Sequence, residues 1–321
     1  MAHPIVVTVG ALATADADGI AASQTNPGAF ELSLNGALSS GSSATNIAAS
    51  QAVGSATTLT LDGVLVKDGV AHLGGNKRII ITSAGNDTGI TFTVAGTLSG
   101  GAANGIAYQS EVVTGSNASV VGTTKLFTTI TSVTSSGAAA GNVSVGVNGS
   151  VTLDKPRRVL ITSAGNDSGI TFTVYGTDWN NNPISQAVTG GNATTAATTL
   201  DFATVDRIKL SAAAAGAVTV GTNGVAASRP IFFDPHADPA VGLQVSVTGT
   251  VSYTVQQSLD DPNRVGLASV NWVDHPDTNL VAATATKQGN YAYLPHVSRI
   301  VLNSGSGTVV MTAIQAAGRT Y

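Results

Sequence analysis

The chain has 321 residues, of which 10% are charged and 5% are aromatic, and its formal net charge is −4. It contains 37 glycines and no cysteine, which excludes a disulfide framework, a thiolate zinc site and a cysteine nucleophile. Nucleic-acid-binding proteins normally carry a basic face, so we expect no nucleic-acid partner for this acidic chain. No run of about 18 apolar residues occurs, so we expect no membrane-spanning helix and no membrane partner.

Residues 1–61 are expected to form an N-terminal β segment with an arm rich in glycine, serine and alanine. Ile5 to Val9 are mostly β-branched, which favours a first strand over a signal peptide, since no Lys or Arg precedes them. Residues 36–56 are low in complexity and would be flexible on their own. We therefore expect neighbouring subunits to hold this arm in place. The sequence leaves open whether residues 1–61 fold alone.

An internal repeat organises the middle of the chain. Residues 78–97 recur as residues 158–177, and only four of the twenty positions differ. Farther downstream the matching pairs are 75 residues apart instead of 80, so the first copy carries five extra residues. We expect this insertion in a surface loop within residues 98–108, because such loops tolerate changes of length. The repeat predicts two homologous β modules, residues 62–151 and residues 152–228.

Each copy of the repeat has apolar residues at every second position, which predicts strands with one buried face and one threonine-rich face. The apolar set is Ile90, Phe92 and Val94 in the first copy and Ile170, Phe172 and Val174 in the second. The Ser-Ala-Gly-Asn-Asp sequence before this set favours turns, so residues 158–175 are predicted to form a hairpin with a long loop. We interpret the recurring loop as structural, with sugar or calcium binding as the alternative.

The C-terminal part, residues 229–321, is expected to form a third β module. Apolar residues alternate over residues 243–247 and 251–255, and Gly249 lies between them as a turn or bulge. Residues 299–312 repeat the order of an arginine, three apolar residues, a glycine-rich turn and a second strand. This echo predicts a diverged copy of the repeated hairpin.

Asn-Gly pairs at residues 148–149 and 223–224 predict tight hairpins after two short strands. Helical periodicity is almost absent. The sequence therefore predicts an all-β fold of tandem β-sandwich or barrel-like modules, with less than about a fifth of the chain in helices.

A few polar clusters are candidates for chemistry. Asp234, His236 and Asp238 have residue types and spacing that suit a divalent cation, and a second cluster follows at residues 274–277. The alternative is turn chemistry, which Asp and Pro favour on their own account. The Asp260-Asp261 pair precedes a proline and has the same explanation. We predict no bound metal, no cofactor and no enzymatic activity.

Basic pairs and tryptophans are the candidates for interaction. Arg157-Arg158 and Arg78, which follows a lysine, are expected to pair with acidic residues at a subunit contact. Trp179 lies where the two copies of the repeat diverge, and Trp272 has acidic neighbours. Each tryptophan is expected to be either an exposed contact anchor or a ring folded over the edge of its own module.

Three segments carry a resemblance to a known family. Residues 158–182, 216–224 and 253–261 resemble uncharacterised structural proteins of tailed bacteriophages, and the resemblance extends through most of residues 60–321. It implies a virion protein, assembled in the host cytoplasm, that acts as a capsid decoration or cement protein on the major capsid protein or another virion protein. The alternatives are a tail, adaptor or fibre component, and a carbohydrate-binding module or adhesin. We expect a homo-oligomer, with three-fold symmetry because capsid lattices offer three-fold positions.

Overall fold

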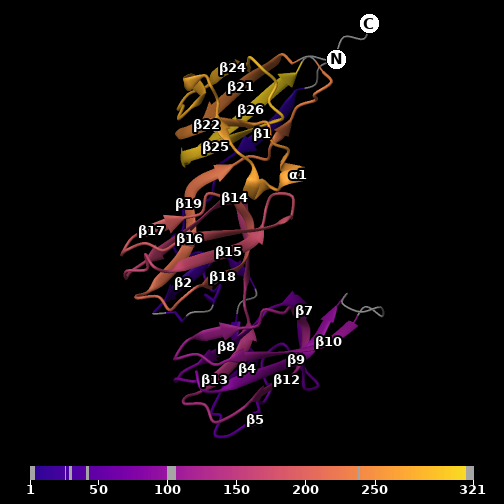
Figure 1. The fold of residues 1–321 in the computed structure, drawn as a ribbon, viewed down its shortest axis with the longest axis vertical. Helices are drawn as coiled ribbons and strands as arrows, with labels where there is room; N and C mark the ends of the chain where they lie inside the picture. The colour runs from indigo at the N-terminus through magenta and orange to yellow at the C-terminus, as the bar shows by residue number, and fades with distance from the viewer. Residues whose placement is uncertain are drawn as a thin grey trace.

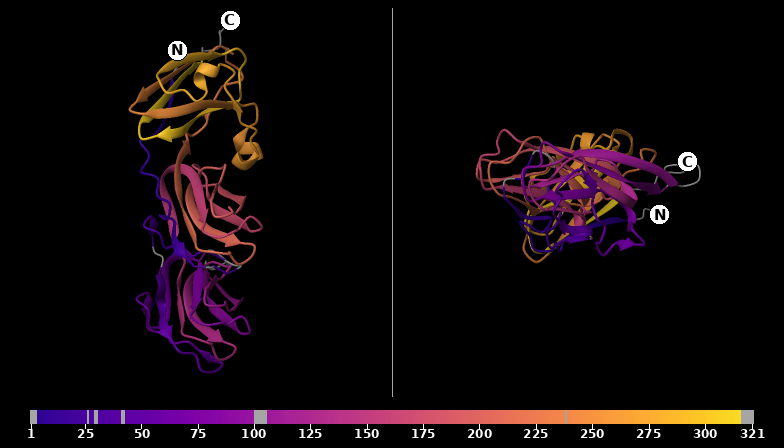
Figure 2. Two further views of the ribbon diagram at one scale, coloured as in Figure 1. Left: turned by 90° about the vertical axis from the view of Figure 1, so that its left-hand side faces the viewer. Right: turned by 90° about the horizontal axis from the view of Figure 1, so that it is seen from below.

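The computed structural model describes residues 4–25, 27–28, 31–40, 43–99, 106–237 and 239–315. Strands make up 56% of the chain and helices 3%, which confirms the all-β prediction. The helical segments of this part are α1 (Pro262–Val265), η1 (Leu267–Ser269) and η2 (Thr278–Leu280). None of the described helices is long and apolar enough to cross a membrane. Figures 1 and 2 show three β bodies stacked along one axis into an elongated molecule.

The body at one end of the stack, module 1, consists of residues 43–148 and is a sandwich of two sheets. Its strands are β4 (Ser43–Gln51), β5 (Thr57–Thr58), β6 (Val66–Lys67), β7 (Val70–Lys77), β8 (Ile79–Ser83), β9 (Thr91–Ser99), β10 (Ile106–Thr114), β11 (Val120–Gly122), β12 (Phe127–Ser135) and β13 (Val143–Val147). One sheet has the order β10-β9-β12-β7-β6, and the other has the order β11-β8-β13-β4. Phe92, Phe127 and Ile130 are fully buried in the core of this module.

The middle body, module 2, combines residues 16–40 with residues 150–228. Its strands are β2 (Ala21–Gln24), β3 (Ser39–Ser40), β14 (Ser150–Ser163), β15 (Thr171–Thr177), β16 (Pro183–Thr189), β17 (Thr195–Ala197), β18 (Phe202–Leu210) and β19 (Val218–Ala227). The long strand β14 pairs with β18 near its start and with β19 toward its end, so it connects the two layers of the module.

The body at the other end, module 3, combines residues 5–9 with residues 229–315. Its strands are β1 (Ile5–Val9), β20 (Ile231–Phe232), β21 (Val241–Thr248), β22 (Val251–Ser258), β23 (Val273–Asp274), β24 (Lys287–Tyr291), β25 (Val297–Gly305) and β26 (Thr308–Gln315). One sheet has the order β1-β26-β21-β24, and β25, β22 and β23 continue the sheet of module 2 beyond β19. The strands predicted at Ile5–Val9 and on either side of Gly249 are confirmed.

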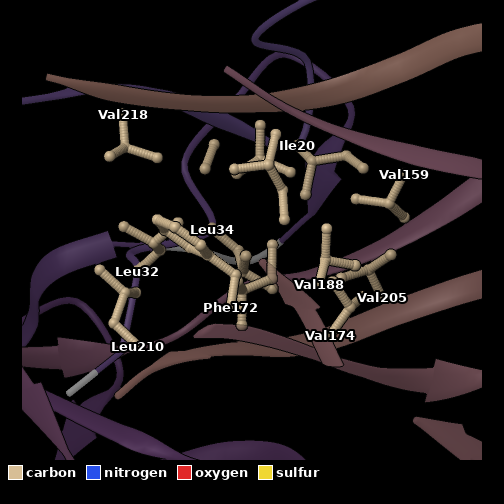
Figure 3. Close-up of a cluster of buried hydrophobic side chains, with 14 of the residues drawn as sticks. Ile20, Leu32, Leu34, Val159, Phe172, Val174, Val188, Val205, Leu210 and Val218 are labelled. Atoms are coloured by element: carbon tan, nitrogen blue, oxygen red, sulfur yellow. The ribbon is translucent and has the colours of Figure 1, made fainter. Parts of the chain in front are cut away.

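The burial expected for the repeat is confirmed for Phe92, Val94 and all three positions of the second copy, but not for Ile90. Phe92 and Phe172 are fully buried, and so are Val94 and Val174. Ile170 is 7% exposed and buried, whereas Ile90 packs against its core while remaining partly exposed. Figure 3 shows Phe172 among side chains of module 2, next to Leu34 from the N-terminal part of the chain.

The N-terminal segment supplies strands to every module. β1 pairs with β26 in module 3, β2 pairs with β19 in module 2, and β4 pairs with β13 in module 1. In sequence, module 1 is therefore nested inside module 2, and module 2 is nested inside module 3. The described part of residues 1–61 is divided among all three bodies.

The expectation that neighbouring subunits hold residues 36–56 is wrong for the described part of that arm. β3 pairs with β14 and β4 pairs with β13, so strands of the same chain bind it. Ile47, Ala48 and Val53 are buried in the core of module 1. These few buried side chains and the hydrogen bonds between strands hold the arm in place, so the chain itself supplies the contacts that we expected from a neighbouring subunit. Residues 41–42 lie outside the described part.

The hairpin predicted over residues 158–175 is also wrong, because the repeated loop carries the chain between layers. β8 pairs with β11 and β13, whereas β9 pairs with β10 and β12. In the second copy, β14 and β15 each pair with β18 but not with one another. β25 and β26, at the echo, likewise belong to different sheets.

The two Asn-Gly pairs do not form hairpins. Asn148 stands where the chain leaves module 1, and its side chain bonds the backbone of Leu32 and Leu34 at 3.3 and 2.8 Å. Asn223 lies within β19. The insertion expected within residues 98–108 falls between β9 and β10, and residues 100–105 lie outside the described part.

Candidate functional site

Charged side chains are buried at the junction between modules 1 and 2. Glu31 is only 3% exposed, and its Oε1 lies 3.3 Å from Nη1 of Arg207. Burial raises the pKa of Glu31 to about 7, although Arg207 and Arg78 oppose that rise. Arg78 reaches the junction from module 1 and donates from Nη1 to the carbonyl oxygen of Thr124 at 2.7 Å. Arg207 also lies 4.0 Å from the centre of the Tyr175 ring.

A second buried carboxylate lies between modules 2 and 3. Asp201 is 5% exposed, with Arg158 Nε 4.0 Å and Arg299 Nη1 3.8 Å from its two oxygens. Burial raises the pKa of Asp201 to about 6 and lowers that of Arg299 to about 10. Arg299 also donates to Oε1 of Gln256 at 2.8 and 3.0 Å and stacks 4.0 Å from the Trp272 ring centre.

Arg157 ties the N-terminal segment to module 2. It is 1% exposed and forms an ion pair with Asp154 at 2.9 Å. Its Nη2 donates to the carbonyl oxygens of Ala13 and Asn223, both at 3.0 Å. Asp154 in turn accepts from the backbone N–H of Ala13 at 2.8 Å, and these bonds lower the pKa of Asp154 despite its partial burial. The pair therefore fixes the path by which the chain passes from module 3 to module 2.

The predicted interaction residues thus gather at the two junctions. Trp179 is half-buried, and the guanidinium of Arg229, the first residue of the second part of module 3, lies 5.4 Å from its ring centre, so the ring lies at the junction between modules 2 and 3. Trp272 stacks on Arg299 within module 3, and Arg299 reaches Asp201 of module 2 across the junction. The acidic partners of Arg157 and Arg158 come from the same chain.

The metal candidates have turn geometry where they are described. Asp234 and His236 are exposed, and the carboxylate of Asp234 accepts from the backbone N–H of His236 at 2.8 Å. Asp238 lies outside the described residues. His275 is buried, stacks on Tyr291 and accepts at Nδ1 from the N–H of Asp277, while burial lowers its pKa. Within the described ranges, no three His, Asp or Glu side chains gather to hold a metal.

The repeated Ser-Ala-Gly-Asn-Asp loops are held from inside. Asp87 is 2% exposed and accepts from the backbone N–H of Ala140 at 2.6 Å. Asp167 is fully buried and accepts from the N–H of Ala215 at 2.7 Å. Each aspartate therefore fastens the crossover loop to the loop that precedes β13 or β19, which agrees with the structural interpretation.

Two exposed apolar features escaped the sequence analysis. On β10, Tyr108 is 84% exposed and Val112 is 62% exposed. On module 3, Leu259, Val273 and Tyr293 are 72%, 53% and 50% exposed and line a groove of about 190 Å³. The signal for the first was present, because apolar residues of β10 occupy both alternating faces in the sequence. The groove is lined by residues from segments that are distant in the sequence, so no local sequence pattern predicts it.

A short repeat also went unnoticed. Residues 20–24 and 47–51 are both Ile-Ala-Ala-Ser-Gln. The last residue of each, Gln24 and Gln51, pairs with equivalent valines of β19 and β13, Val218 and Val143. Comparing these two segments would have placed the first strand of each homologous module.

No protein-family model matches the chain, and a search of curated proteins found no match.

Proposed function

We propose that this chain is a non-enzymatic structural component of a tailed-bacteriophage virion, acting as a capsid decoration or cement protein on the outer shell. The resemblance of residues 158–182 and 253–261 to phage structural proteins supports the proposal. Its partners would be other copies of itself and the major capsid protein or another virion protein. The low content of charged residues leaves little repulsion between copies that lie close together.

The observation that carries the proposal is the way the modules are joined. β19 pairs with β14 in module 2 and with β25 in module 3, so the backbone ladder crosses that junction. The N-terminal segment adds a strand to every module and so links all three a second time. Modules connected by flexible linkers move independently, whereas this construction resists separation and suits a protein that bridges subunits of a shell.

A tail, adaptor or fibre component is the second candidate. The elongated stack of Figure 2 favours it, because a rod of modules suits a protein that projects from a particle or spans between its parts. The way the three modules are joined would suit a protein on the capsid shell and a protein in the tail equally well. The two candidates differ in the binding partner, and that difference is open to direct measurement.

Binding to isolated virion parts tests the proposal. Purified protein is mixed separately with empty capsid shells and with detached tails, and bound protein is measured by sedimentation and located by imaging of a labelled version. We expect saturable binding to shells, and a higher temperature for shell breakage when the protein is bound. Binding to tails but not shells would favour the second candidate, and binding to neither would contradict both.

A further inference from the structure

We propose that a trench between modules 2 and 3 binds an extended, acidic peptide segment of a partner protein, which adds a strand to the open edge of β1. The trench has a volume of about 460 Å³ and is lined by residues 6–9, residues 154–156, Trp179, Ala203 and residues 227–229. Figure 1 shows β1, in indigo, running along module 3 toward module 2. The inference rests on the proposed function, which it deepens by naming the kind of segment that another virion protein would supply.

One wall of the trench is the edge of a sheet. Successive side chains of a strand point to opposite faces, yet all four of residues 6–9 line the trench. A cavity that contacts both alternating sets lies beside the strand, along its backbone groups. Among the described strands, β1 pairs with β26 alone, so its other edge has no strand partner. The trench therefore follows a row of N–H and C=O groups with which a further strand can pair.

The composition of β1 leaves this edge unprotected. Its sequence is Ile-Val-Val-Thr-Val, and Ile5 and Val6 are 40% and 54% exposed. Natural sheet edges are commonly blocked by charged side chains, prolines or bulges. β24, at the opposite edge of the same sheet, has the sequence Lys-Gln-Gly-Asn-Tyr and carries such a charge. The uncharged, β-branched edge of β1 is suited instead to accept an added strand.

The opposite wall also has backbone without a strand partner. β14 pairs with β18 at Thr152 and again at Arg157, and the register shifts between these two residues. Residues 154–156 fall in this irregular stretch and pair with no described strand. The trench thus separates two unpaired stretches of backbone and can take an extended chain lengthwise. At about 3.3 Å per residue, a segment of about four residues matches the length of residues 6–9.

The charges that line the trench favour an acidic occupant. Lys155 and Arg229 are exposed and form no ion pair with any residue of the described ranges. Asp154, the carboxylate among the described lining residues, is balanced by its ion pair with Arg157. The lining therefore keeps the positive charges of Lys155 and Arg229 uncompensated. In a chain with a net charge of −4, this local excess of positive charge favours carboxylates on the partner.

The charged side chains on the other side of Trp179 leave this excess unchanged. Asp178 is 3% exposed, and its carboxylate accepts from two backbone N–H groups of its own turn at 2.7 and 2.9 Å. Asp201, which borders Trp179, lies 4.0 Å from Arg158 and 3.8 Å from Arg299. The two aspartates and the two arginines together carry no net charge, so the trench stays positive.

Synthetic peptides are the probe for this site. The first is a labelled hexapeptide of alternating threonine and glutamate with blocked termini, and two matched peptides replace glutamate by lysine or carry a methyl group on every backbone nitrogen. A shift of one residue turns a strand over, so the glutamates can reach whichever face holds Lys155 and Arg229. We expect saturable binding of the glutamate peptide to the full chain. Each matched peptide should bind at least about 10-fold more weakly, because one loses the charge match and the other the hydrogen bonds to β1.

A charge-reversed protein tests the residues. Lys155→Glu combined with Arg229→Glu should weaken binding of the glutamate peptide at least about 10-fold and strengthen binding of the lysine peptide. Both side chains are exposed, and thermal unfolding checks that the variant folds. Lys67→Glu is the matched control, because Lys67 is an exposed lysine on β6 at the edge of module 1, and it should bind like the natural sequence. Hydrogen exchange should slow at amides of residues 6–9 when the glutamate peptide is bound.

Four results would overturn the inference: no saturable binding of the glutamate peptide up to about 1 mM, equal binding of the three peptides, unchanged binding by the charge-reversed protein, or slowed exchange only outside β1. Self-association of the natural protein that already protects residues 6–9 would also overturn it, because a second copy would then fill the trench. Shell binding is measured separately. Protein that binds shells but not the glutamate peptide overturns the inference while the proposed function stands, and protein that binds the peptide but neither shells nor tails contradicts the proposed function alone.

Discussion

Modules 1 and 2 have nearly the same core and different surroundings. Phe92 and Phe172 occupy equivalent buried positions, and Asp87 and Asp167 fasten equivalent loops. The edge strands differ, because β10 exposes Tyr108 where β16 has a proline. The copy that lies within the stack has a neighbour for its edge strand from the same chain, η1, whereas among the described strands β10 pairs with β9 alone. The two copies have thus kept the buried phenylalanine and aspartate that the fold requires. Their edge strands have diverged, in keeping with the different position of each module in the stack.

The largest expected effect tests whether the two cores are equivalent. Phe92→Ala and Phe172→Ala should each cost about 3–5 kcal/mol of unfolding free energy, because each removes a fully buried ring and leaves a cavity. Denaturant unfolding of the two variants, followed with probes in each module, measures these losses. Val64→Ala, at a 90% exposed position, should have almost no effect. A loss below about 1 kcal/mol for either phenylalanine would show that the cores are not equivalent.

The sequence predicted the fold class and the repeat, because alternation along a strand and long identical segments are local signals. The sequence did not predict which strands the repeated loops connect. The loops of residues 83–90 and 163–170 look like hairpin loops, yet they carry the chain between layers, and which layer follows depends on distant strands. The glycine-rich arm was expected to need neighbouring subunits, because its large apolar residues, Leu38, Ile47 and Val53, are too few to show a periodicity.

The candidate residues were identified better than their partners. Arg78, Arg157 and Arg158 drew notice as the recurring basic residues, and all three lie at junctions. Their neighbours come from up to 144 residues away, as between Arg157 and Ala13. Spacing in the sequence holds no information about such contacts. The buried carboxylates Glu31 and Asp201 gave no signal either, since isolated acidic residues are common on surfaces.

The next prediction compares the two junctions by pH. Glu31 has a folded pKa of about 7 and Asp201 one of about 6, both above their ordinary values of 4.5 and 3.8. A carboxyl group whose pKa is raised by folding stabilises the folded state fully at pH values below its ordinary pKa. This stabilisation is lost as the pH rises from the ordinary pKa to the folded pKa. We therefore expect the protein to lose about 2 kcal/mol per junction between pH 4 and pH 8.

Thermal unfolding at intervals across that range checks the comparison. Glu31→Gln should remove the part of the loss that falls between about pH 4.5 and pH 7, and Asp201→Asn the part that falls between about pH 3.8 and pH 6. Asp62→Asn is a control, because that carboxylate accepts an exposed backbone bond from Ala49 outside either junction. Stability that rises from pH 5 to pH 8, or a slope unchanged in both junction variants, would contradict the assignment.

The smallest effect compares the two strands that the N-terminal segment gives to the homologous modules. Gln24 bonds the backbone N–H and C=O of Ser33, each at 2.9 Å, and Gln51 does the same for Thr60 at the same distances. Each glutamine thereby bridges the two ends of the short loop that follows β2 or β4, the strands that pair within modules 2 and 1.

Replacing either glutamine by alanine removes two hydrogen bonds to the backbone. The bonds of Gln24 are part-buried and those of Gln51 are exposed, so water replaces the second pair more easily. We expect Gln24→Ala to cost about 1–2 kcal/mol and Gln51→Ala about 0.5 kcal/mol. Hydrogen exchange of the Ser33 and Thr60 amides should quicken in the matching variant only. Equal losses of unfolding free energy in the two variants would contradict this expectation. They would mean that the neighbours of module 2 do not protect the hydrogen bonds of Gln24 beside β2, and that modules 1 and 2 differ only at their edge strands.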